Sequence, residues 1–176
     1  LLFSFKISAN ETWSLDKDLS SINFELPVFL AKNVVGEFKE IEGLVEMNFD
    51  LQNNNRAIFS VNIESVEINY SNYRNLLLSN VFFNKKKYPI ALIDTKKFLY
   101  SDQKEIDLNV EMTIKNITKN IPIKLEIIHL TKDLVQIKGQ IFFSRTDFEI
   151  GIGKWSSTVI LKDKVNITTN LFLFRD

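Results

Sequence analysis

Alternation of apolar and polar residues constrains the fold of this chain more than any other feature of its sequence. Between Ile106 and Ile114 every even-numbered residue is apolar and every odd-numbered one is polar. The same period recurs at 45–51, 59–63, 121–127, 135–143 and 165–171. A two-residue period indicates β-strands with one buried and one solvated face, which are typical of antiparallel sheets. The chain is therefore predicted to be all-β and antiparallel.

The segments between these stretches predict how the strands are connected. Asn53-Asn54-Asn55, Lys115-Asn116 and Lys132-Asp133 are predicted to be tight turns, since Asn tolerates the left-handed backbone that hairpins need. The alternation changes phase between Phe59 and Tyr70, which predicts a β-bulge near Ser65. Residues 72–83 cluster their leucines and are predicted to form one or two short helices. Roughly eight strands with one short helical insertion indicate a barrel or a sandwich.

Composition limits the classes of function. The 176 residues fit a single domain, and Lys+Arg equals Asp+Glu at 22 each. This balance lacks the basic excess of a nucleic-acid binder, so no nucleic-acid partner is expected. With no Cys and one His, the chain lacks the usual means of building a catalytic triad or a metal site. We therefore expect no enzyme activity, metal or cofactor; His129 is interpreted as a strand-end residue.

The N-terminal residues 1–9 are apolar and end in small residues. They fit the end of a secretory signal peptide cleaved after Ala9, but also an ordinary strand or a fragment boundary. No later apolar run reaches the roughly 18–20 residues that a membrane-spanning helix needs, so a soluble mature protein is expected.

Several short motifs follow one another along the chain. Trp-x-x-Asp and Ser-x-x-x-Phe precede Gly-x-Phe, Gly and apolar-x-Phe-Asp, here Trp13, Asp16, Ser20, Phe24, Gly36, Phe38, Gly43, Phe49 and Asp50. The helical stretch has an arginine, a leucine, an aromatic pair and Tyr-Pro, here Arg74, Leu78, Phe82, Phe83, Tyr88 and Pro89. A Thr-Ile turn and an Arg-x-Asp-Phe signature precede the last strand, through Thr113, Ile114, Asn116, Thr118, Arg145, Asp147, Phe148, Gly151 and Val165. In order and spacing, over about residues 12–173, these motifs resemble the YceI-like, polyisoprenoid-binding family.

The resemblance implies an eight-stranded, lipocalin-like antiparallel barrel over residues 10–176, enclosing an apolar tunnel. It also implies a periplasmic carrier or storage protein for a polyisoprenoid or fatty-acyl chain, which makes residues 1–9 a signal-peptide remnant. Family members often dimerise, so a homodimer is a further expectation. The chain departs from the family pattern in Leu26-Pro27-Val28-Phe29, where members often carry His, and at two expected glycines, replaced by Asn116 and Glu149.

The candidate ligand-binding residues are mostly aromatic or aliphatic. They are Phe24, Phe38, Phe49, Arg74, Leu78, Phe82, Phe83, Ile141, Phe143, Arg145 and Phe148. Arg145 continues the inward phase of the preceding strand, so its guanidinium is expected inside the barrel or at its mouth. There it would bind a phosphate or carboxylate head group, or pair with Asp147 or Asp16 and cap the barrel.

Three alternatives stay open at this point. Phe82 and Phe83 would gate or line a tunnel, or anchor the helical insertion to the barrel. Arg74 has the same two interpretations as Arg145. An eight-stranded barrel either holds one small ligand or fills its interior with side chains. The rival to a lipid carrier is therefore a structural or protein-interaction barrel with a filled interior.

Overall fold

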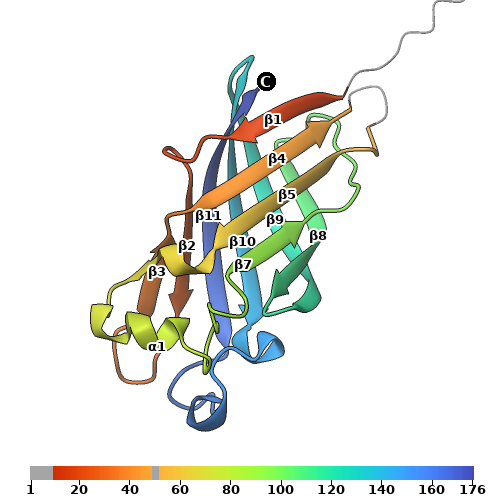
Figure 1. Ribbon diagram of the computed structural model, residues 1–176. Helices are drawn as coiled ribbons and strands as arrows, with labels where there is room; N and C mark the ends of the chain where they lie inside the picture. Colours follow the sequence, from red (N-terminus) through yellow and green to blue (C-terminus); the bar gives the residue numbers. More distant parts are fainter. Residues whose placement is uncertain (1–9, 49–51) are drawn as a thin grey trace, which may run out of the picture.

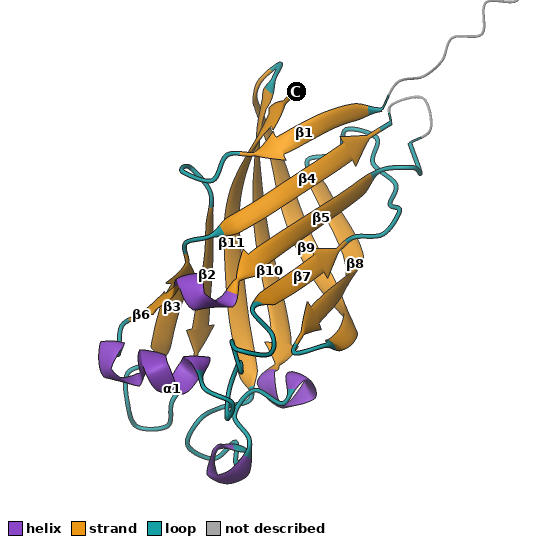
Figure 2. Ribbon diagram, viewed as in Figure 1, coloured by secondary structure: helices purple, strands orange, loops and turns teal. Residues whose placement is uncertain are grey.

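The predicted strands are present in the computed structural model, which describes residues 10–48 and 52–176 (Figures 1 and 2). In chain order the strands are β1 (Glu11–Leu15), β2 (Ser21–Leu26), β3 (Val34–Phe38), β4 (Ile41–Met47), β5 (Arg56–Asn62), β6 (Val66–Ile68), β7 (Ile90–Asp94), β8 (Glu105–Ile114), β9 (Ile117–Thr131), β10 (Leu134–Ser144) and β11 (Lys164–Arg175). The helical elements are the 3-10 turns η1 (Ile63–Ser65), η2 (Ser71–Tyr73), η3 (Arg145–Phe148) and η4 (Gly153–Trp155), and the helix α1 (Arg74–Leu78).

Three of the strands are interrupted. β1 pairs with β11 through Leu15 and Leu173, and β2 continues along the same strand from Ser21, opposite Asn170. In the same way β4 continues β3 after residues 39–40, and β6 continues β5 after η1. When each interrupted strand is counted once, the antiparallel sheet has eight strands, and the pairing of β1 with β11 closes it. The predicted all-β, eight-stranded barrel with a short helical insertion is confirmed.

The alternation places one face of each long strand in the core. On β8, for example, Ile106, Val110, Met112 and Ile114 are buried, whereas the intervening residues Asp107 and Asn109 are exposed. The phase change near Ser65 is real, but its cause is the 3-10 turn η1 rather than the predicted β-bulge. Asn62 begins this turn, and its side chain accepts a hydrogen bond from the Glu64 backbone amide at 3.0 Å. Both devices shift the register, so a phase change alone does not distinguish them.

The hairpin between β8 and β9 is the tight turn that the sequence predicts. Ile114 pairs with Ile117, and both intervening residues have left-handed backbones, Lys115 with φ 53° and Asn116 with φ 61°. Two consecutive left-handed residues define the turn whose twist matches that of the flanking strands. Asn is among the residues that adopt this conformation most readily, so Asn116 replaces the expected glycine without disrupting the hairpin.

The two halves of the barrel interior differ. Away from α1, side chains from β1, β4, β10 and β11 pack into a continuous apolar core that includes Trp13, Leu15, Val45, Val135 and Leu173. The other end carries α1, η3 and η4, and the loops that join β2 to β3 and β10 to β11 (Figure 1). The described side chains at the end away from α1 are therefore packed against one another.

Candidate functional site

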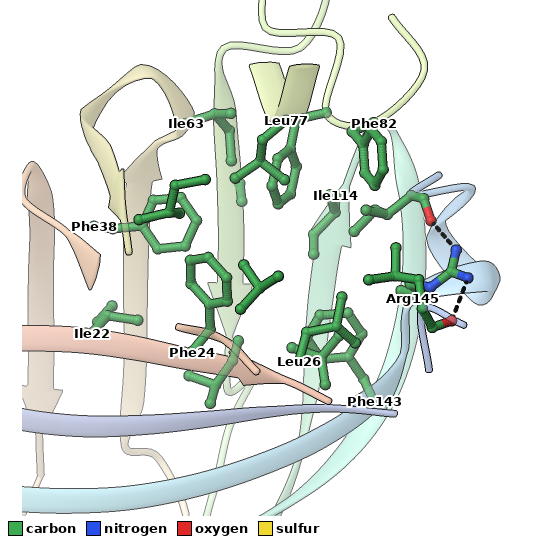
Figure 3. Close-up of a pocket in the computed structure, with 18 of the residues that line it drawn as sticks. Ile22, Phe24, Leu26, Phe38, Ile63, Leu77, Phe82, Ile114, Phe143 and Arg145 are labelled. Carbon is green, nitrogen blue, oxygen red and sulfur yellow. Dashed lines mark hydrogen bonds between the residues drawn. The ribbon is translucent and has the colours of Figure 1, made fainter. Parts of the chain in front are cut away.

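The helical end of the barrel contains a cavity of about 390 Å³. Its wall is formed by side chains of β2, β3, β7, β8, β10 and β11 and by α1 and its following segment (Figure 3). Nearly all of these side chains are apolar; the lining residues with a polar group are Lys32, Tyr70, Tyr73, Arg145, Trp155 and Thr169. The volume lies within the range of small-molecule sites, and an apolar wall of this kind accepts an apolar ligand.

The helical insertion supplies one side of this wall. Leu76 and Leu77 of α1 line the cavity, and Leu78 is buried in the adjoining core. In the described sheet β6 pairs with β3 alone, and α1, which follows it in the chain, contacts β6. Arg74 joins the two, because its guanidinium donates hydrogen bonds to the carbonyl oxygens of Val66, at 2.7 Å, and Glu64. Backbone groups at the edge of a sheet need such partners.

The aromatic pair after α1 both anchors the insertion and lines the cavity. The Phe82 ring lies 5.7 Å from that of Trp155, and the Phe83 ring lies 6.3 Å from that of Phe38 in an edge-to-face arrangement. The carbonyl oxygen of Val81 accepts hydrogen bonds from the amides of Gly151, at 3.0 Å, and Ile152, at 2.9 Å. The insertion is thus tied to the loop between β10 and β11.

Phe24 extends into the cavity from β2. Its ring lies over Gly36 of the paired strand β3, where a Cβ would stand 2.5 Å from the ring. Only glycine allows the ring this position, and the Phe24 centroid is 5.7 Å from that of Phe38. Figure 3 shows these rings with Ile22, Leu26 and Phe143 around one apolar space.

Arg145 is fully buried at the edge of the cavity, as its inward phase predicts. Its guanidinium makes five hydrogen bonds, all to main-chain carbonyl oxygens: Lys162 at 3.0 Å, Ile150 at 2.8 Å, Gly151 at 3.4 Å, Ser157 at 3.0 Å and Leu161 at 2.9 Å. Five is the full donor capacity of arginine. In Figure 3 the group is directed at the loop backbone, at the margin of the apolar space.

This arrangement corrects the predicted carboxylate partner of Arg145, because the acceptors are carbonyls of the β10–β11 loop rather than Asp147 or Asp16. Burial lowers the pKa of Arg145 from its ordinary value, while the charge of Asp163 raises it. Gly151 is required beside it: with φ 83°, a Cβ there would stand 2.8 Å from Nη1. Glu149, which replaces the other expected glycine, is also left-handed, with φ 53°.

The structure brings together most of the predicted ligand-binding residues. Six line the cavity: Phe24, Phe38, Phe82, Phe83, Phe143 and Arg145. Leu78, Ile141 and Phe148 are buried in the neighbouring core, and Arg74 bonds to backbone; none of these four lines the cavity. Phe49 lies outside the described residues. The assignment of these residues to a ligand stays a prediction.

Sequence reasoning missed the loop residues of the wall. Trp155, Ile160 and Leu161 from the β10–β11 loop and Val28 and Lys32 from the β2–β3 loop line the cavity. Loops have no periodicity, so no inward phase marks these positions. The available signal was the run of three apolar residues Val159-Ile160-Leu161 in the connection between β10 and β11.

The single histidine of the chain lies away from the cavity. His129 Nε2 lies 3.2 Å from Tyr100 Oη and 3.1 Å from Asp102 Oδ1, on β9 and a surface loop. Within residues 10–48 and 52–176 no His, Cys, Asp and Glu side chains group in a way that would hold a metal ion. The same residues include no helix long and apolar enough to cross a membrane.

Known proteins share the sequence pattern and the fold of this chain. The YceI-like domain model matches residues 13–173. Among solved structures, BcnA of Burkholderia cenocepacia has a TM-score of 0.81 and 18% sequence identity, covering 90% of this chain and 98% of its own. A polyisoprenoid-binding domain of Saccharophagus degradans, implicated in plant cell wall breakdown, has a TM-score of 0.73 and 12% identity, covering 93% and 98%.

A Campylobacter jejuni YceI protein also matches, with a TM-score of 0.67 and 23% identity over 85% of this chain and 89% of its own. No curated protein sequence matches the chain. At these identities the three structures show a shared fold.

Proposed function

This chain belongs to the YceI-like domain family, and from that premise we propose that it binds one long apolar lipid, a polyisoprenoid or fatty-acyl chain, in the cavity at the helical end of its barrel. The observation that carries this proposal is the cavity itself, about 390 Å³ with an almost wholly apolar wall. A structural neighbour described as a polyisoprenoid-binding domain supports the same class of ligand. The rival function requires a filled interior, whereas the described side chains at the helical end surround this cavity.

The energetics of apolar burial are sufficient for such a ligand. Burying each methylene contributes about 0.8 kcal/mol, so about twelve methylenes contribute roughly 10 kcal/mol. This is comparable with the cost of about 4–15 kcal/mol for lost freedom on association. The saturated donors of Arg145 leave the apolar chain, rather than a head group at that guanidinium, as the main source of affinity.

The two tryptophans of the chain provide a test of where the lipid binds. Trp155 lines the cavity, whereas Trp13 is buried in the packed half of the barrel. In a Trp13→Phe variant stripped of lipid, we expect a fatty acid brominated along its chain to quench Trp155 emission and to saturate near one ligand per chain. Bromine quenches only tryptophans in close contact, so fluorescence titration reports occupancy of this cavity.

The reciprocal variant is the control. In Trp155→Phe the remaining Trp13 emission should stay unquenched at the same ligand concentrations. Equal quenching in both variants would show unspecific association, and an unquenched Trp155 at saturating ligand would refute the site.

A binding role without catalysis and without a cofactor other than the lipid is part of the proposal. The proposed location is the periplasm, which the family resemblance supports. Fractionation of the cells that naturally produce the protein tests this location. The homodimer stays a prediction, which sedimentation velocity on the purified protein measures.

A further inference from the structure

We infer that the rim of the cavity is a docking surface for an anionic lipid bilayer. We define the mouth rim as residues 27–33, 69–73 and 152–162, which surround the cavity at the helical end. The inference rests on the proposed function in one respect: a lipid held in this cavity would enter and leave through the rim, which gives docking on a bilayer its role. The surface itself is argued from its own side chains.

The mouth rim exposes large apolar side chains at its tips. Leu30 is 90% exposed, and Phe29, Tyr73, Val159 and Ile160 are each more than half exposed. Single exposed apolar residues are common, but a group of them beside one opening marks an interaction site. Phe, Leu and Ile at such tips contribute apolar area to a membrane interface, and tyrosine suits its boundary with water.

The backbone conformation of Leu30 also supports a docking surface. Its backbone is left-handed, with φ 55°, which is uncommon for any residue but glycine and costs free energy. The side chain that this backbone presents lies almost wholly in water and so gains nothing from the fold. Strain of this kind persists where another requirement outweighs it.

The apolar tips are held in one rigid arrangement. The β2–β3 loop pairs with the β10–β11 loop, because the amide of Phe29 donates to the Ile160 carbonyl at 2.8 Å and the amide of Lys162 donates to the Pro27 carbonyl at 3.0 Å. The third segment joins through Tyr70, whose hydroxyl donates to the Lys32 carbonyl at 3.0 Å. A surface ordered before contact loses little conformational freedom on docking.

Charge identifies the partner as anionic. The mouth rim contains three lysines, Lys32, Lys154 and Lys162, and no acidic residue, although the whole chain is balanced at 22 basic and 22 acidic residues. The acidic residues that flank the rim segments in the sequence lie outside the rim; they are Glu25, Glu67, Glu149 and Asp163. Glu25 accepts a hydrogen bond from the Asn33 side chain, and Asp163 accepts hydrogen bonds from Thr146. Lysines among exposed apolar residues fit a surface of anionic lipid head groups.

The test is co-sedimentation of delipidated full-length chain with large vesicles of phosphatidylcholine containing 30% phosphatidylglycerol, on the order of the anionic content of natural membranes. We expect binding that weakens at high salt and on vesicles of phosphatidylcholine alone. Leu30→Asp should weaken it at least about tenfold, because it replaces the most exposed apolar tip with an acid. Lys154→Glu should weaken it at least about fivefold.

Leu99→Asp is the matched control, since Leu99 is 56% exposed in the loop between β7 and β8, outside the rim. This variant should bind the vesicles within about twofold of wild type. Quenching of Trp155 by the brominated fatty acid, measured on each variant, separates docking from lipid binding. Wild-type chain that takes up the fatty acid but does not co-sediment would overturn the docking surface, favour a protein partner for the rim and leave the proposed function standing. Equal binding by Leu30→Asp and Leu99→Asp would overturn it as well.

Discussion

Arg145→Met is expected to lower the free energy of unfolding by about 3–5 kcal/mol, because the substitution leaves buried carbonyl oxygens without donors. Five carbonyls of the β10–β11 loop and its surroundings depend on this one guanidinium. Methionine has a comparable length and no polar hydrogen, so the apolar contacts of the side chain are largely kept. Urea denaturation followed by circular dichroism measures the difference.

Arg145→Lys and Arg56→Met complete this experiment. Lysine keeps the charge but has three donors on a single atom, so it should recover only part of the lost stability. Arg56 forms a half-exposed ion pair with Asp94 at 2.7 Å, so its loss should lower stability much less than the loss of the fully buried Arg145. An Arg145→Met protein that is as stable as wild type but no longer binds lipid would instead assign the guanidinium to a lipid head group.

Ala91→Trp is expected to weaken lipid binding roughly 1000-fold, because the indole occupies the space of about five methylenes, worth about 4 kcal/mol. Ala91 lies on β7, lines the cavity and contacts both halves of the core, so a larger side chain there enters the space that the lipid needs. The free energy of unfolding should stay the same or rise, since the ring fills an empty volume rather than a packed one. Titration with the brominated fatty acid measures the affinity.

Ile90→Trp is the matched control for this substitution. Ile90 is the neighbouring residue on the same strand, is 45% exposed and does not line the cavity. Its variant should bind lipid like wild type. Unchanged affinity in Ala91→Trp would place the lipid elsewhere on the protein.

The alternation of apolar and polar residues predicted the strands, because burial of one strand face makes every second residue apolar. β8, β9 and β10 follow from it directly, and so does the burial of Arg145. The partners of Arg145 did not follow, since they are backbone atoms of a loop whose path no periodicity records. The same reason explains why Trp155 and Leu30 were not predicted to belong to the site or its rim.

The two replaced glycines show what a family pattern adds. Asn116 and Glu149 both have left-handed backbones, with φ of 61° and 53°, so the expected glycines mark real conformational requirements. For Asn116 the sequence alone predicted that the turn would be kept, because asparagine adopts this conformation readily. For Glu149 nothing in the sequence predicted the left-handed end of η3 without the family pattern.

Native mass spectrometry of the freshly purified protein, followed by organic extraction, shows whether the chain carries a lipid. Lipid binding in the cavity predicts a mass excess of one apolar lipid per chain, which is removed by extraction and identified in the extract as an isoprenoid or acyl chain. A chain that is free of ligand, and that takes up neither added isoprenoid nor added fatty acid, would contradict it.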